Sequence, residues 1–325
     1  MTQCRARSLE KHPPVRWRLA ARILAAAGSL CCAGYTFAGA AGTDATLRLS
    51  PGEFAPGLIG ETELRLQVVP DGASLILTAE SARRAKLSSW WLGPQLDIHV
   101  GPVAVQAEET LTFYRVAGLR EWGLVVWTEA PLGSDADGEL GPGDLRQDTV
   151  SFKLRDPQAE ETLYSLPLVA KHGQGLGTES RVGNEDLFVN FSFRRRETLV
   201  TAEGAAVLAR ANGAKWNGPV ATMPIVLGAR RPVRPLHLAN PWVLGPFQVS
   251  DLTGRLGDYG DSTKVAETDP GGDSDEVVVT GKQDRAEYTV KRITLGTDAL
   301  ASCSEVTFDK ARHKLLLSCV PQSVK

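Results

Sequence analysis

Short runs of alternating hydrophobic and polar residues recur along the chain, and most of them are bounded by glycine, proline or aspartate. The segment Leu64–Val69 has this alternation, which is typical of a β-strand with one buried face. Pro70-Asp71-Gly72 then supplies turn residues, and Leu75–Leu77 is predicted to return as a second strand of a hairpin. Helical patterns are few and brief. The chain is therefore predicted to be mainly β.

A short helix is predicted directly after this hairpin. Thr78 is a favourable N-cap residue, and Glu80 adds a negative charge to the first turn. The same succession recurs later in the chain: a strand at Leu187–Phe193, a turn at Arg194-Arg195-Arg196, a return strand at Thr198–Val200 and a helix start at Thr201-Ala202-Glu203. The triplet Thr-Ala-Glu thus occurs twice in matching surroundings.

Two further pairs of segments match in the same order. Val100-Gly101-Pro102 corresponds to Leu244-Gly245-Pro246, and each precedes a predicted strand. Leu140-Gly141, followed by Val150 and Phe152, corresponds to Leu295-Gly296, followed by Val306 and Phe308. Because the three correspondences are collinear, the sequence indicates duplication of one domain-sized unit.

The duplication predicts two lobes. We expect the first at residues 41–168 and the second at residues 185–325, joined by a linker at residues 169–184 whose glycines favour flexibility. The second lobe is expected to carry an acidic loop at residues 261–276, because that stretch is rich in Asp, Gly and Ser and has no apolar periodicity.

The N-terminal residues 1–40 have the order of a secretory signal peptide: basic residues, an apolar stretch, and a small-residue Ala38-Gly39-Ala40 site. We therefore expect an exported protein, periplasmic or extracellular, with no membrane span after cleavage. Of the five cysteines, only Cys303 and Cys319 lie outside this segment. In an oxidising compartment they are predicted to form a disulfide that joins the ends of a hairpin.

The overall charge argues against nucleic acid as a partner. The chain has 36 Lys and Arg against 38 Asp and Glu, so it lacks the strong positive field that such binding uses. The histidines show no metal-ligand spacing, and no phosphate-binding loop is present. No metal and no cofactor is expected.

These repeated segments resemble the retropepsin-like and pepsin-like aspartic peptidases, in which a hairpin leads to Asp-Thr-Gly and a Gly-containing apolar segment follows later. Leu75–Ser81 and Leu199–Gly204 match the first feature, whereas Asp137–Leu145 and Ile293–Leu300 match the second. The resemblance covers most of the chain after the signal segment. It implies two related acid-protease-like β-barrel lobes with short helices and a central groove.

The Asp-Thr-Gly motif itself is intact nowhere in the chain. In one register Thr78 and Thr201 take the positions of the catalytic aspartates. In a second register, which aligns Gly72-Ala73 with the family's Gly-Ala, Pro70 takes that position with Asp71 beside it, and the arginine turn of the second lobe offers no acid. The family mechanism needs two carboxylates that share one proton. Neither register supplies them.

Three other acids are candidates for catalysis. Glu80 and Glu203 are placed symmetrically, so the duplication would bring them face to face across a pseudo-two-fold axis. Against this role, an acid in the first turn of a helix is ordinarily stabilised by unpaired backbone N–H groups and stays charged. Asp137 is a further candidate, although an Asp-Gly pair is typical of a turn.

Three functions follow from these features. The first is a catalytically inactive pseudo-peptidase that binds an extended peptide or protein in the interlobe groove. The second is an active aspartic-type endopeptidase that uses non-standard acids. The third is an envelope scaffold or accessory of an outer-membrane transport system, because Glu276-Val277-Val278-Val279-Thr280-Gly281 resembles the segment by which outer-membrane transporters bind the envelope's energy-transducing protein. An ordinary strand flanked by charged residues is the alternative for that segment.

Overall fold

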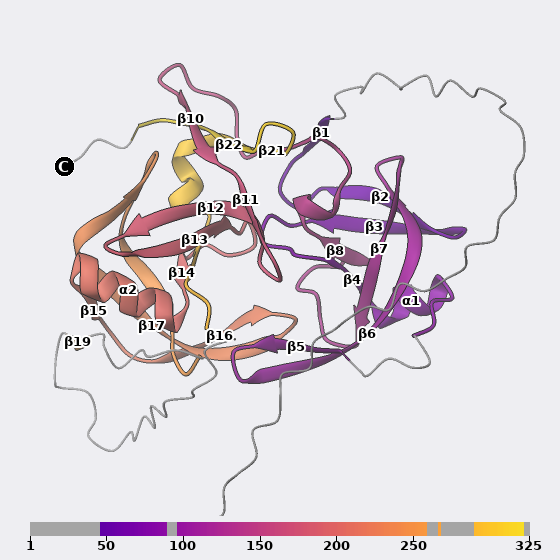
Figure 1. Cartoon of the computed structure of the whole chain (residues 1–325), viewed down its shortest axis with the longest axis horizontal. Coiled ribbons are helices and arrows are strands. Elements are labelled where there is room, and N and C mark those ends of the chain that lie inside the picture. The colour runs from indigo at the N-terminus through magenta and orange to yellow at the C-terminus, as the bar shows by residue number, and fades with distance from the viewer. Residues whose placement is uncertain (1–45, 90–95, 259–265, 268–288, 322–325) are drawn as a thin grey trace, which may run out of the picture. The chain divides into compact units, whose positions relative to one another are not determined.

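The computed structural model of this chain describes residues 46–89, 96–258, 266–267 and 289–321. The predicted signal peptide, the segment Glu276–Gly281 and all of the acidic loop except Ala266–Glu267 lie outside these residues. The described part is mainly β with two short α-helices, which confirms the predicted fold class (Figure 1). No helix within it is long and apolar enough to cross a membrane.

The first lobe is a seven-stranded sheet, six strands of which close into a barrel. Closure is made by the pairing of Gly57–Ile59 with Tyr114–Val116, which removes both free edges of the six strands. In sheet order the strands are β2 (Phe54–Ile59), β3 (Thr62–Val68), β8 (Gly138–Leu140), β4 (Leu75–Thr78), β7 (Leu119–Thr128), β6 (Val103–Val116) and β5 (Leu96–Val100).

The second lobe is a ten-stranded sheet. The pairings between its described strands leave the sheet open. Its strands are, in order, β11 (Val169–Lys171), β12 (Gly175–Val182), β13 (Glu185–Phe191), β20 (Arg292–Leu295), β14 (Leu199–Val200), β18 (Phe247–Arg255), β17 (Ala229–Leu244), β15 (Ala214–Trp216) and β19 (Ala266–Glu267), with β16 (Ala221–Val226) beside β17.

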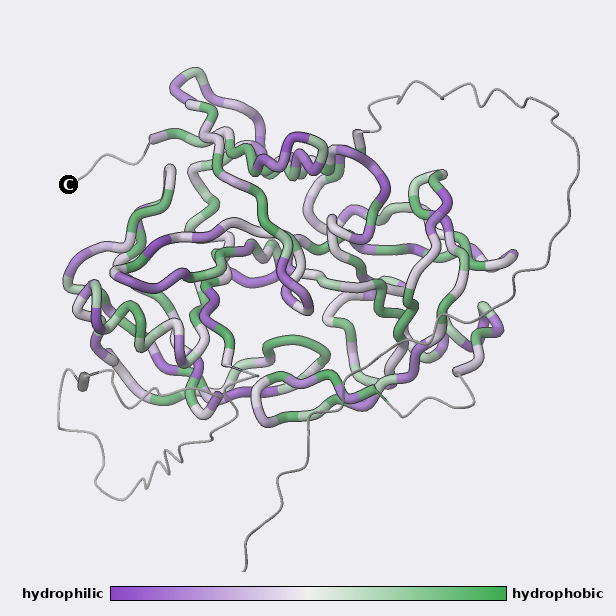
Figure 2. The backbone as a smooth tube through the Cα atoms, in the orientation of Figure 1, coloured by the Kyte–Doolittle hydropathy of each residue, from purple (hydrophilic) through white to green (hydrophobic). Residues whose placement is uncertain are grey.

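The central strands of the two lobes pair in the same order and with the same relative directions. In the first lobe β8 is parallel to β3 and antiparallel to β4, and β4 is parallel to β7. In the second lobe β20 is parallel to β13 and antiparallel to β14, and β14 is parallel to β18. Apolar and polar positions alternate along many of these strands (Figure 2). The shared connectivity supports duplication of one unit.

Leu140-Gly141 and Leu295-Gly296 are equivalent in this arrangement. Both leucines are fully buried at the ends of β8 and β20. A Cβ atom on Gly141 would lie 2.2 Å from the carbonyl oxygen of Gly72, and one on Gly296 would lie 2.2 Å from that of Arg196. Only glycine fits at either position, because the backbone of a loop packs directly against it.

A third sheet joins the two lobes. It has the strand order β1 (Thr46–Leu49), β9 (Thr149–Lys153), β21 (Cys303–Asp309), β22 (Lys314–Cys319) and β10 (Thr162–Pro167). Strands β9 and β21 are antiparallel, with Val150 opposite Phe308 and Phe152 opposite Val306. This register relates the two segments by a two-fold rotation about the central pair, Ser151 and Thr307.

Two short helices follow β4 and β14, as predicted. Helix α1 (Ala79–Arg84) is capped by the hydroxyl of Thr78, which accepts a hydrogen bond from the backbone N–H of Ser81. Helix α2 (Ala202–Asn212) is capped in the same way by Thr201. The 3₁₀ turns η1 (Pro142–Asp144) and η4 (Ala299–Ser302) follow β8 and β20.

The two hairpins predicted before these helices are wrong, although their strands are correct. Strand β8 lies between β3 and β4, and β20 lies between β13 and β14. The segments β4 and β14 are almost fully buried, so each needs hydrogen-bonded partners on both sides. Those partners come from distant parts of the chain, and local turn residues do not reveal them.

Two other predictions differ from the structure. The Gly-Pro segments are not equivalent, because Gly101 turns between β5 and β6 whereas Gly245 turns between β17 and β18. Both glycines have positive φ, which tight hairpin turns commonly require, so the match reflects turn chemistry. Residues 169–184, predicted as a flexible linker, are mostly in β11 and β12, which pair with each other and with β13.

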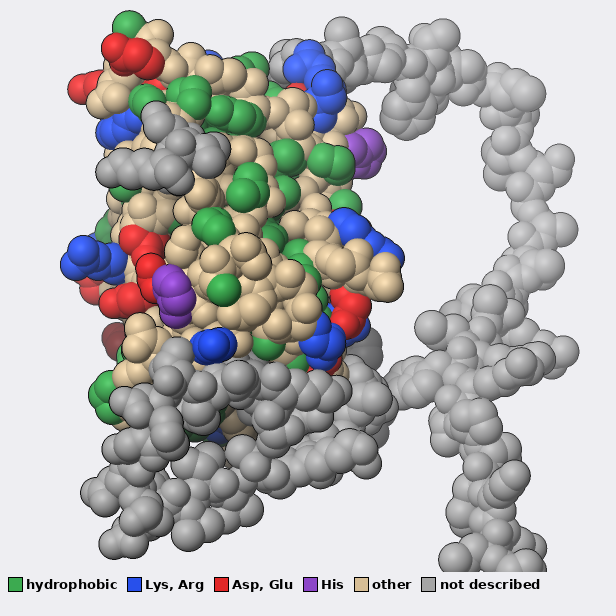
Figure 3. Space-filling model, turned by 90° about the vertical axis from the view of Figure 1, so that its left-hand side faces the viewer, with side chains coloured by type: hydrophobic (Ala, Val, Ile, Leu, Met, Phe, Trp, Pro, Cys, Tyr) green, Lys and Arg blue, Asp and Glu red, His purple; other side chains and the backbone are tan. Residues whose placement is uncertain are grey.

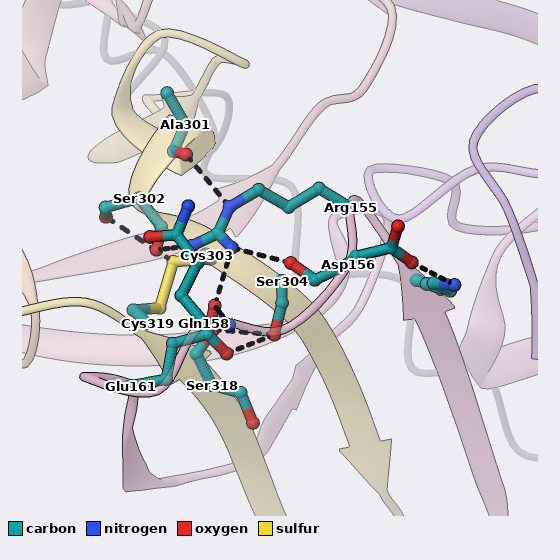
Figure 4. Close-up of polar contacts among 11 residues, drawn as sticks. Arg155, Asp156, Gln158, Glu161, Ala301, Ser302, Cys303, Ser304, Ser318 and Cys319 are labelled. Atoms are coloured by element: carbon teal, nitrogen blue, oxygen red, sulfur yellow. Dashed lines mark hydrogen bonds and ion pairs between the residues drawn. A yellow bond between two sulfur atoms is a disulfide. The ribbon is translucent and has the colours of Figure 1, made fainter.

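The predicted disulfide and hairpin are confirmed: Cys303 and Cys319 lie opposite each other at the ends of β21 and β22 and form a bond. Arg155 lies beside this end of the hairpin and donates to the carbonyl oxygen of Ser302 at 2.6 Å (Figure 4). It also forms an ion pair with Glu161 at 2.7 Å, and Ser304 donates to the same carboxylate. The contacts connect the β9–β10 loop to the hairpin.

Removal of the disulfide is expected to destabilise the fold. Its sequence separation is 16, and a loop of about this length accounts for ~3 kcal/mol in the chain-entropy account. The variant Cys303→Ala/Cys319→Ala should therefore unfold at a lower urea concentration than the oxidised protein, and reduction of the wild type should have a similar effect. Unchanged midpoints in both cases would contradict the expectation.

Glu161 is expected to contribute to acid sensitivity. Burial acts to raise the pKa of its carboxyl, but the hydrogen bonds from Ser304 and the Gln158 N–H and the charge of Arg155 outweigh burial and lower this pKa. The stabilisation is therefore present above the unfolded-state pKa of about 4.3 and is lost as the pH falls through the lower folded-state value. The difference in unfolding free energy between wild type and Glu161→Gln should shrink on acidification. A difference in unfolding free energy that does not change with pH would argue against this role of Glu161.

Candidate functional site

A cavity of about 420 Å³ lies between the two lobes. The first lobe lines it with the loop from Val69 to Ser74 and with residues 98–101 at the tip of the β5–β6 hairpin. The second lobe contributes Arg194, Arg195 and residues 225–227 at the tip of the β16–β17 hairpin. Its volume lies within the range of small-molecule and cofactor sites.

The two hairpin tips pack together beside this cavity. Val100 of the first lobe belongs to one hydrophobic cluster with Leu199, Ile225 and Val233 of the second, and β5 and β16 run close together in Figure 1. The cluster is separate from the main core. The hairpins therefore close one side of the cavity with an apolar contact of their own.

The loops that enter the cavity from the two lobes are structurally equivalent. Val68 pairs with Leu140 in the first lobe, and Phe191 pairs with Leu295 in the second. Asp71 lies three residues after Val68, and Arg194 lies three residues after Phe191. Asp71 and Arg194 therefore occupy equivalent positions in the two lobes.

Asp71 and Arg194 form an ion pair between the lobes. The Arg194 Nη2 atom lies 3.3 Å from Asp71 Oδ1, and its Nη1 atom lies 2.6 Å from Glu139 Oε2. Burial raises the pKa of Glu139, even though Arg194 opposes this. Burial acts to lower the pKa of Arg194, but the charges of Asp71 and Glu139 outweigh it and raise that pKa. One guanidinium thus pairs with two carboxyl groups.

This arrangement differs in chemistry from a peptidase dyad. A guanidinium is charged at all ordinary pH values and accepts no proton. Two carboxylates can share a proton only where no closer cation stabilises both as anions. At Asp71 and Glu139 such a cation is present. The pair is therefore suited to holding the lobes together and to orienting a ligand.

Further arginines surround this pair. Arg195 donates to the carbonyl oxygen of Ile225 at 2.6 Å, which ties the interlobe loop to a hairpin tip. Arg255 and Arg231 share the carboxylate of Asp258, at 2.7 and 3.5 Å. Arg292 lines the cavity. Burial, and then the neighbouring charge of Arg255, lower its pKa to about 10.

The predicted threonine positions serve the helices. Thr78 caps α1 and is not among the residues that line the cavity. Thr201 caps α2 and also lines the cavity, and its hydroxyl donates to the carbonyl oxygen of Val290. The two threonines are thus cap residues, and only one of them faces the candidate site.

The alternative acids lie apart from the cavity. Glu80 is exposed in the first turn of α1, and Glu203 lies in the first turn of α2, 3.8 Å from Arg210. Asp137 accepts hydrogen bonds from Ser81 at 3.1 Å and Arg84 at 2.6 Å. It also accepts one from the backbone N–H of Arg65. Its contacts hold the barrel to α1.

The sequence interpretation missed the role of the arginines. Arg255 ends the largely uncharged strand β18 and Arg292 begins the otherwise uncharged strand β20, and the sequence pattern predicted only a turn for the run that contains Arg194. The sequence signal for these arginines was a charged residue next to a strand that is buried on both faces. In the described ranges no group of three or more His, Cys, Asp and Glu side chains is arranged to hold a metal.

Loss of the Arg194 guanidinium is expected to destabilise the protein in a pH-dependent manner. Arg194→Met leaves two buried carboxylates without their cation, which costs about 3 kcal/mol near neutral pH. Burial already raises the pKa of Glu139 against the effect of Arg194, and removal of the arginine raises it further, so the loss should diminish as the pH falls and Glu139 becomes protonated.

Urea unfolding near pH 7 and near pH 4 measures this effect. Arg181→Met is the matched control, because Arg181 pairs with Asp186 at 3.0 Å on the exposed surface, where such a pair contributes about 0 to 1 kcal/mol. Equal losses for both variants at both pH values would contradict the assigned role of Arg194.

Comparison with known proteins leaves the fold and the cavity as the basis for functional inference. No protein-family model matches this chain, and no curated protein matches its sequence.

Proposed function

We propose that this protein is an exported, aspartic-peptidase-like protein that binds an extended segment of a peptide or protein in the interlobe cavity without cutting it. The observation that carries this proposal is the ion pair between Asp71 and Arg194. These residues stand at equivalent positions of the two lobes, close to where the resembled peptidases hold two carboxylates around a shared proton.

The pairing of every acid in the cavity with an arginine supports the proposed absence of hydrolysis by the family mechanism. The acids that line the cavity are Asp71, Glu139 and Asp258, and each is paired with an arginine in the structure. A carboxyl group that is paired with a guanidinium is not placed to share a proton with a second carboxyl group. Without a neutral carboxylic acid beside a carboxylate, water is not activated and the leaving amine receives no proton.

Binding of an extended chain is supported by the strands around the cavity. Among the described strands, β5 pairs only with β6, and β16 pairs only with β17. Their outer edges therefore keep backbone N–H and C=O groups that an extended peptide can pair with. Ile98 and Val226, half-buried apolar residues of the two hairpins that line the cavity, add surface for alternate side chains of such a peptide.

The outer face of the second lobe offers less to a ligand. On the face in Figure 3, which looks onto the side of the second lobe, basic and acidic side chains are dispersed and hydrophobic ones are scattered among polar atoms. Among the described residues drawn there, no single sign of charge forms a broad patch. The cavity therefore remains the best candidate for ligand recognition.

Filling the cavity is expected to abolish binding. Ser74 lines the cavity, whereas Ser50 is exposed on the first lobe. In Ser74→Trp the indole ring occupies the ligand space, so retention of a pooled library of short peptides should fall at least about tenfold. Ser50→Trp should retain the library like the wild type. Mass spectrometry of the bound and unbound pools measures both binding and cleavage.

Thermal unfolding checks that each variant is folded. If Ser74→Trp fails to fold, Val226→Trp fills the same cavity from the β16–β17 hairpin of the second lobe. Peptide fragments that accumulate with the wild type and not with the cavity variants would contradict the absence of hydrolysis. Equal retention by the wild type and both cavity variants would show that the ligand binds elsewhere.

A further inference from the structure

The residues around the interlobe cavity carry an excess of positive charge. Arg194 is paired with Asp71 and Glu139, and Arg255 and Arg231 share Asp258. Among the described residues, neither Arg195 nor Arg292 forms an ion pair with a carboxylate. Arg195 is bonded to a neutral carbonyl oxygen.

The environment of Arg292 is particularly unfavourable for an unpaired cation. No described residue forms a hydrogen bond or ion pair with its guanidinium, yet the side chain is partly buried and lines the cavity. Burial is the main cause that lowers its pKa, and the charges of Arg255 and Arg195 add to this, whereas Asp71 and Asp258 oppose it only in part. The Nε atoms of Arg195 and Arg255 are themselves buried without a hydrogen-bond partner.

Such a cluster costs stability in the free protein. A cation taken out of water is favourable only where an anion or several acceptors replace the lost solvation. Within the described residues three carboxylates serve five arginines: Asp71, Glu139 and Asp258 against Arg194, Arg195, Arg231, Arg255 and Arg292. This excess of positive charge does not stabilise a packed core, whereas it would stabilise a bound anion.

We propose that Arg292 and Arg195 form a carboxylate subsite in the cavity, which selects peptides that present an acidic side chain or a free C-terminus there. This proposal rests on the proposed function and names the chemistry that the cavity recognises. A guanidinium presents N–H donors in a planar fork that matches the two oxygens of a carboxylate. A ligand carboxylate would also supply the charge that the subsite lacks.

Peptides that differ only in charge test the subsite. The probe is a short labelled Ala/Val peptide in four forms: with a free C-terminus, with an amidated C-terminus, and in the amidated form with one internal Glu or Gln. The expected result is that either the free acid or the Glu form binds at least about tenfold more tightly than its neutral partner. The form that gains affinity identifies the source of the carboxylate. Fluorescence polarisation gives the affinities.

Arg292→Met provides the matching change in the protein. It should reduce the preference for the acidic form to less than about threefold while the neutral peptide binds as before. The free variant should also unfold at a higher temperature than the wild type, since an unpaired buried cation is removed. A purely structural arginine would give the opposite change in unfolding temperature. Arg181→Met, at an arginine that pairs with Asp186 on the exposed surface, is the control and should change neither property.

The outcomes separate this proposal from the proposed function. Peptides that bind in the cavity with equal affinity in all four forms would overturn the carboxylate subsite and leave peptide binding intact. An unchanged acidic preference in Arg292→Met would overturn the assignment as well. If no form binds and the cavity variants have no effect on library retention, peptide binding itself fails, and the subsite fails with it.

Discussion

The pairing of β9 with β21 is the interaction on which the rest of the structure depends. It is the contact at which equivalent strands of the two lobes are joined by backbone hydrogen bonds, with Ser151 opposite Thr307 at its centre. The rings of Phe152 and Phe308 pack edge to face across it, with centroids 6.1 Å apart, and Phe308 also contacts Phe191 of the second lobe. Backbone pairing and aromatic packing together make one continuous core out of two sheets.

This constraint fixes how the loops between the lobes meet. Once β9 and β21 are antiparallel about a single pair, equivalent loops must approach each other from opposite sides. Asp71 and Arg194 are therefore brought together because they are equivalent, and their charges differ because the two copies of the unit have diverged in sequence. In a symmetric pair of acids the same geometry produces repulsion and a shared proton. Here it produces attraction between a carboxylate and a guanidinium.

The cavity beside this ion pair combines rigidity with unsatisfied charge. Glycine at positions 141 and 296 allows the loop backbones at Gly72 and Arg196 to pack directly against the ends of β8 and β20. The positive charge held there lowers the stability of the empty protein, and the same charge gives a ligand carboxylate a favourable site. Functional sites commonly show this opposition between the stability of the free protein and the affinity for a ligand.

The sequence by itself determined the local features of this protein. Strand segments such as Leu64–Val69 followed from side-chain alternation, the helix starts at Thr78 and Thr201 from cap chemistry, and the bond between Cys303 and Cys319 from the elimination of other cysteines. All of these depend on neighbouring residues or on simple counting. Only the tertiary structure decided that β8 lies between β3 and β4, that the two Gly-Pro turns are not equivalent, and that Arg194 faces Asp71. Strand partners and charge partners come from distant parts of the chain, and Arg194 and Asp71 are more than a hundred positions apart. No local sequence pattern shows which distant segment will provide the partner.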